Sequence, residues 1–147
     1  MTPSLPDILM GQFIALSAPL PPEASGAYAE GRTGMVAMLA VLASQEAERG
    51  VAARLWENGA LRALFARAAA GYDSAFRGAL AVAAEQADED FAWSALDGAN
   101  ADLRRLLIVL HEAVEARGDA ALDLEILALY QRMAYQRRLE LPEAVAG

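Results

Sequence analysis

Apolar residues recur three and four positions apart along nearly the whole chain, a spacing typical of amphipathic α-helices. Alternation of apolar and polar residues, the mark of a half-buried strand, does not persist over a useful length. The pattern therefore predicts an all-α protein. We expect a single-domain bundle over residues 1–147, built from five to six mostly antiparallel helices that end in a helical hairpin.

Local signals divide the first half of the chain into three expected helices. The first begins near Ser4, its predicted cap, and stops at the prolines of residues 19–22. The second runs from about 23 to 49 and ends at Gly50. The third covers 51–70, with a break at Asn58-Gly59 as an alternative, because this dipeptide favours turns.

The second half contains three further expected helices. Asp73 or Ser74 caps the first of them, and an acidic stretch over 85–90 then interrupts the apolar pattern. Asp97-Gly98 reads as a turn. Asn100 is expected to cap a helix that ends at 117–118, and Asp119 to cap the last one. Such a short connection predicts an antiparallel hairpin.

The last helix is apolar on two opposite sides. One side is formed by Leu122, Ile126, Leu129, Tyr130 and Met133. The other is formed by Leu124, Ala128, Tyr135 and Leu139. Because terminal helices are often peripheral, the second side predicts the interface of a two-fold homodimer. The alternative is that this helix lies in the centre of the bundle.

Charge and composition exclude several partners. The net charge is −8 and the isoelectric point is about 4.6, which argues against nucleic acid and against an anionic membrane surface. The chain has no cysteine, no basic leader sequence and no uncharged stretch long enough to span a membrane, so a cytoplasmic protein is expected. Its arginine-rich, lysine-free usage is typical of a GC-rich bacterial genome.

His111 is the single histidine, and its surroundings match no catalytic or metal motif. A zinc-protease motif needs a second histidine one turn away, and a di-iron motif needs glutamate where Ile108 stands. We therefore expect no catalytic, metal-binding or cofactor-binding residues and no cofactor. His111 is interpreted as a structural residue at the edge of the core, and with Arg104 and Glu115 it forms the candidate polar or ligand site.

One segment resembles a known family. Residues 39–50, ending in Gln45-Glu46-Ala47-Glu48-Arg49-Gly50, are similar to the second-helix signature of an uncharacterised family of small helical bacterial proteins. Members are encoded near acyl-CoA dehydrogenases and aminoglycoside-phosphotransferase-like kinases. The closing hairpin, residues 103–142, has a similar layout. The resemblance covers about a third of the chain and implies no catalytic residues.

These observations favour a non-catalytic accessory or protein-interaction domain that associates with itself. A second hypothesis is a small-ligand-binding bundle with an apolar pocket near His111. An enzyme is the third; it would have to use His111 with Glu112 or Glu115 and an arginine.

Overall fold

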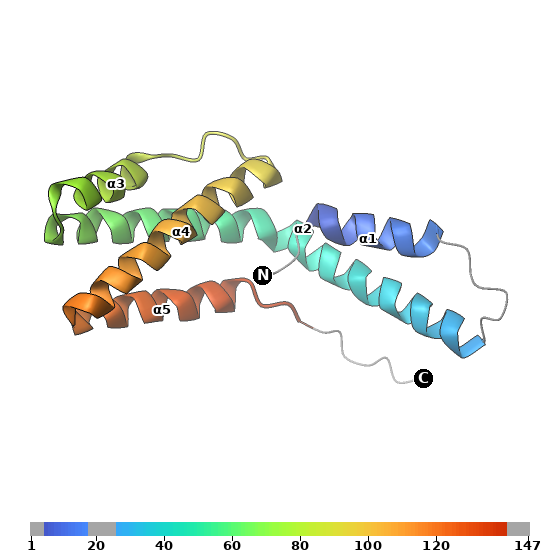
Figure 1. The fold of residues 1–147 in the computed structure, drawn as a ribbon. Helices are drawn as coiled ribbons and strands as arrows, with labels where there is room; N and C mark the ends of the chain where they lie inside the picture. The colour runs from blue at the N-terminus through green and yellow to red at the C-terminus, as the bar shows by residue number, and fades with distance from the viewer. Residues whose placement is uncertain (1–4, 18–25, 141–147) are drawn as a thin grey trace. The chain divides into compact units, whose positions relative to one another are not determined.

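A computed structural model describes residues 5–17 and 26–140 of the chain (Figure 1). Of these residues, 88% are helical, and none of them lies in a strand. The elements are α1 (Leu5–Ser17), α2 (Gly26–Ala68), the short 3-10 helix η1 (Ala69–Gly71), α3 (Ser74–Glu85), α4 (Trp93–Arg117) and α5 (Ala120–Gln136). The prediction of an all-α bundle with five to six helices is confirmed.

Helix α2 is one continuous helix where the sequence predicted two. Neither Gly50 nor the Asn58-Gly59 pair interrupts it. A glycine inside a helix costs about 1 kcal/mol relative to alanine, which tertiary packing can offset. Gly50 is buried, and the Asn58 side chain bonds to Asp88 of a distant segment instead of closing a turn.

Helix α4 begins at Trp93, earlier than predicted. Asp97-Gly98 lies within it and forms no turn. Asn100 does not cap the helix, since its side chain is buried and bonded to residues of α2. The sequence signal was misleading because the polar groups that resemble caps bond across the fold.

Three predicted boundaries are confirmed by their hydrogen bonds. Asp73, one of the two alternatives for α3, accepts from the backbone N–H groups of Ala75 and Phe76 at 3.1 and 3.0 Å. Asp119 accepts from Leu122 N–H at 3.2 Å at the start of α5. Gly118 ends α4 in the left-handed conformation, with φ of 66°. Ser4 and the prolines of 19–22 lie outside the described residues.

Contacts divide the chain into two compact units, with the boundary inside α2. One comprises residues 51–137, and the other comprises residues 1–50 and 138–147. Whether the whole chain behaves as a single domain stays a prediction.

The unit of residues 51–137 holds the large core. Within it, α3, α4 and α5 each return roughly antiparallel to the preceding helix, and α4 and α5 form the predicted hairpin (Figure 1). The apolar core draws on all four helical segments, with Leu61, Leu64, Phe65, Leu80, Leu103, Leu107, Leu110, Val114, Ile126, Leu129 and Met133 as its large members. Burial of this core is the main source of stability for the unit.

The other unit has few buried apolar groups among its described residues. Ile8 of α1 and Ala43 of α2 are buried, and Gln12 donates to the Val36 carbonyl at 3.3 Å. The Gln45 side-chain amide donates to the Glu140 carbonyl at 2.6 Å and accepts from the Glu140 N–H at 2.8 Å. The segment after α5 is thus fixed to α2 by paired hydrogen bonds similar to those of a strand.

Candidate functional site

His111 lies near the end of α4, next to the buried face that carries Leu107 and Leu110. Its side chain is 19% exposed. The Nε2 atom lies 2.8 Å from Oδ1 of Asp123 on α5 and 3.8 Å from Oε1 of Glu115, one turn further along α4. The structure therefore brings together two of the three predicted site residues, His111 and Glu115, and adds Asp123.

The ring of Tyr130 packs against the His111 imidazole at this site. Its ring centroid lies 5.6 Å from that of His111, at a tilt of 53°. Burial raises the pKa of the Tyr130 hydroxyl; the positive charge of Arg104 lowers this pKa in part, and the negative charge of Glu115 raises it further. Arg104, the third predicted site residue, is exposed and acts on the site through its charge.

Sequence reasoning missed Asp123. This residue lies on α5, so the i, i+4 spacing within α4 could not identify it. The usable signal was the short connection at Gly118-Asp119, which places the first turns of α5 beside the last turns of α4.

An open pocket of about 270 Å³ adjoins this cluster at the turn between α4 and α5. Its lining consists of Val114, Glu115, Gly118, Asp119, Ala120 and Asp123. Three of the six lining residues carry carboxylates, and two of these also face His111. The pocket therefore gives solvent or a small ligand access to the acidic side of the cluster.

A second pocket, of about 330 Å³, lies on the same unit and is lined in part by Arg67, Tyr72, Arg117 and Glu125. Its cations already have partners within the fold. Arg67 pairs with Glu125. Arg117 lies 4.6 Å above the Tyr72 ring and donates to the Gly71 carbonyl at 2.5 Å. Through these contacts, each of the two arginines joins its own helix to another part of the fold.

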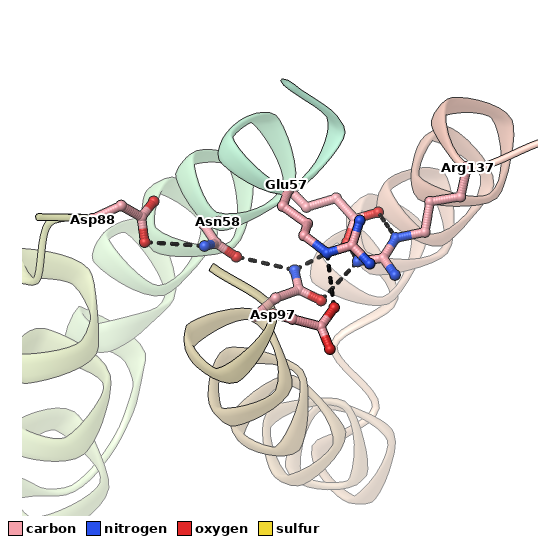
Figure 2. Close-up of polar contacts among 7 residues, drawn as sticks. Glu57, Asn58, Asp88, Asp97 and Arg137 are labelled. Atoms are coloured by element: carbon pink, nitrogen blue, oxygen red, sulfur yellow. Dashed lines mark hydrogen bonds and ion pairs between the residues drawn. The ribbon is translucent and has the colours of Figure 1, made fainter. Parts of the chain in front are cut away.

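A buried polar network crosses the same unit (Figure 2). Glu57 of α2 has no exposed surface, and Arg137 donates to both of its oxygens, at 2.5 and 2.7 Å. Arg137 also donates to Oδ1 of Asn100 at 2.8 Å. The Asn100 Nδ2 donates to Glu57 and to Asn58, each at 3.0 Å.

Asn58 continues the network to the segment after α3. It donates to Asp88 at 3.0 Å, and the Arg62 guanidinium bonds both oxygens of Asp88, at 2.7 and 2.8 Å. Hydrogen bonds from Arg62 hold the pKa of Asp88 below its usual value, against the opposing effect of burial and with help from Asn58.

A neighbouring pair joins α2 to the start of α4. Arg54, which is 2% exposed, donates through Nε to Asp97 at 2.7 Å. Its guanidinium carbon lies 3.8 Å from the centroid of the Trp93 ring, a cation–π contact.

This network is structural in character. Each carboxylate in it accepts from an arginine, so none has the geometry of an uncommitted acid or base. One signal could have revealed it: Arg54, Glu57 and Asn58 share a helical face with Leu61 and Phe65. Polar residues at core positions need buried partners.

Three of the four residues of the predicted α5 interface are exposed, and the interface itself stays a prediction. Leu124 is 67% exposed, Tyr135 is 61% exposed and Ala128 is exposed. Leu139 does not belong to this side of the helix, because α5 ends at Gln136. It is half-buried in the segment that contacts α2 in the other compact unit.

Helix α1 exposes a second apolar surface. Gln12 bonds to α2 and Ile8, one turn before it, is buried, whereas Leu9, Met10, Phe13 and Ile14 are 49%, 58%, 65% and 60% exposed. At 100° per residue these four lie within an arc of about 140°, on the side opposite Ile8. Helix α1 is therefore apolar on both faces.

Comparison with protein-family models, curated proteins and solved structures gives no match to this chain. Among the described residues, no helix is both long and apolar enough to cross a membrane.

Proposed function

We propose that this protein is a non-catalytic protein-interaction domain that associates with itself through the exposed apolar face of α1. The observation that carries the proposal is the two-sided apolar character of this helix. One side packs on α2, and the other presents Leu9, Met10, Phe13 and Ile14 to solvent. A helix that is apolar all round is normally buried.

The size of the exposed surface fits an interface. In the same unit, α2 adds Tyr28, Met35 and Met38, which are 55%, 66% and 37% exposed. A large side chain offers roughly 150–250 Å² when fully exposed, so the four of α1 expose on the order of 450 Å², and the three of α2 bring the total for both helices to on the order of 800 Å². A standard interface buries about this area on each partner, and isolated exposed patches on monomers are usually smaller.

A second copy of the chain is the occupant that we propose. Apart from Asp7 in its first turn, α1 carries no charged residue, so its exposed face offers little to select an oppositely charged partner. A self-complementary apolar contact needs no such selection, and a two-fold pair is the commonest oligomer. The expected function is that of an accessory domain in a bacterial cytoplasmic assembly.

The experiment is light scattering over a concentration series. The wild type is expected to be dimeric, and a Phe13→Glu/Ile14→Glu variant monomeric, because burying two carboxylates in an apolar contact is unfavourable. Leu124→Glu/Leu127→Glu is the matched control, since it places two charges at exposed apolar positions of α5. Circular dichroism of each variant establishes that it is folded.

The outcomes show whether the chain associates with itself and whether α1 or α5 forms the contact. A monomeric wild type contradicts self-association. A dimer that survives the α1 charges but not the α5 charges places the interface on the α5 side predicted from the sequence. Loss of the dimer by the α1 variant alone supports the proposal.

A second function has one observation in its favour. The open pocket beside Glu115 and Asp123 is close to the small-ligand site considered near His111. Small-ligand pockets are mainly apolar and of about 300–1,000 Å³. The size of this pocket and its three carboxylates favour a small cationic ligand over an apolar one.

A further inference from the structure

We infer that His111, Glu115 and Asp123 form a binding site for a divalent transition-metal ion of the zinc type. One ligand atom from each residue lies within 4.8 Å of the other two. The residues come from the two arms of the α4–α5 hairpin, so the fold assembles a ligand set that neither helix contains by itself. This site is separate from the proposed interface on α1.

The separations suit a single ion. Zinc binds imidazole nitrogen and carboxylate oxygen at about 2.0–2.2 Å, so neighbouring ligand atoms of a tetrahedral site lie about 3.3 Å apart. The distances from His111 Nε2 to Asp123 and to Glu115, 2.8 and 3.8 Å, lie on either side of this value. Side-chain adjustments of about half an ångström would bring these two separations to that value, and the carboxylates of Glu115 and Asp123 start within 4.8 Å of each other.

Charge and chemistry define the class of ion. The two carboxylates match the charge of a divalent cation, and the imidazole favours zinc-type ions over magnesium or calcium. To bind, Nε2 must present its lone pair to the ion, so the neutral imidazole carries its proton on Nδ1. The fourth position would face the open pocket that Glu115 and Asp123 line.

The three ligand side chains differ in how much of their surface is exposed. His111 and Asp123 are 19% and 34% exposed, and the Tyr130 ring packs beside the imidazole. Glu115 is 67% exposed. We therefore expect His111 and Asp123 to dominate the affinity and Glu115 to contribute less. The positive charge of Arg104, which acts on Tyr130 beside the imidazole, opposes the binding of a cation.

The experiment uses tag-free full-length protein and Zn²⁺, in competition with a chromophoric chelator. One ion per chain is expected to bind. His111→Gln and Asp123→Asn should each weaken the affinity by about tenfold or more, and Glu115→Gln by a smaller factor. Glu112→Gln is the matched control, since Glu112 is an exposed neighbour on α4 outside the ligand set and the same charge is removed. Co²⁺ absorption gives a second reading, because Co²⁺ in a four-coordinate protein site has much stronger visible bands than aqueous Co²⁺.

Any one of three results would overturn the inference. These are an absence of saturable Zn²⁺ binding, equal affinity in the wild type and the well-folded Asp123→Asn variant, and an equal loss in Glu112→Gln and Glu115→Gln. The last result would show general attraction of cations by an acidic surface. Selective loss in the three ligand variants, together with loss of the Co²⁺ bands in His111→Gln, supports it.

Discussion

The carboxylate of Glu57 shows how a single residue can hold several elements together. It is fully buried and receives both of its strongest hydrogen bonds from Arg137, which follows the last residue of α5. A buried ion pair adds little stability compared with apolar residues of the same size, but removal of one partner leaves an uncompensated charge.

We predict that Arg137→Met lowers the free energy of unfolding by about 3–5 kcal/mol, because Glu57 then stays charged without a cation. Urea denaturation measures the change. Arg138→Ala is the control, and its exposed pair with Glu140 should contribute less than about 1 kcal/mol.

The double variant Glu57→Met/Arg137→Met separates the charge effect from loss of packing. It should recover much of the stability, because both charges are then gone. If Arg137→Met costs no more than Arg138→Ala, the network does not stabilise the unit in the way described.

At the scale of the element, two glycines near the ends of α4 have opposite roles. Gly118 ends the helix with φ of 66°, a conformation that an L-residue adopts at a cost, although a Cβ there would meet no atom within 4 Å. Gly98 lies inside the helix, also with open space around a Cβ. The difference between the two is therefore one of backbone conformation and not of packing.

We predict that Gly118→Ala destabilises the protein by about 1 kcal/mol and that Gly98→Ala stabilises it by about 0.5–1 kcal/mol. The reason is that alanine suits a helix interior and disfavours the left-handed region. Thermal and urea unfolding of both variants measure the two changes in stability. Stabilisation by Gly118→Ala, or a loss with Gly98→Ala, would contradict the structure of α4.

Helix α2 also shows what the segment resembling a known family does physically. Within it, Gln45 bonds the backbone of Glu140 in both directions, and Arg49 donates to Gln45 at 2.8 Å and to the Arg138 carbonyl at 3.3 Å. These side chains fix the segment that follows α5. Membership of that family stays a prediction.

At the scale of the whole molecule, buried apolar surface is unevenly distributed. The large apolar cluster belongs to residues 51–137, whereas Ile8 and Ala43 are the buried apolar residues described in the other unit. Local opening is easiest where few apolar contacts are buried.

We therefore predict that amide hydrogens of residues 26–42 exchange much faster than those of 56–66, although both belong to α2. Hydrogen exchange followed by mass spectrometry measures this at low protein concentration. At high concentration, exchange over α1 and residues 26–42 should slow if α1 forms the proposed dimer. Uniform protection along α2 would contradict the prediction.

The sequence by itself determined the helical class and three of the helix boundaries. Apolar spacing gave the helices, and Asp73, Gly118 and Asp119 gave their ends, because capping and the left-handed turn depend on residues within a few positions of one another. His111 and Glu115 lie four positions apart, so they meet on one face of α4 for the same local reason.

Only the tertiary structure decided where polar residues find partners. Asn100 resembled a cap and Asn58-Gly59 a turn, yet both asparagines bond across helices, 42 positions apart in the chain. Asp123 meets His111 from the opposite arm of the hairpin. A single sequence records which groups need partners, but the partners themselves are chosen by packing between distant segments, which periodicity and spacing do not encode.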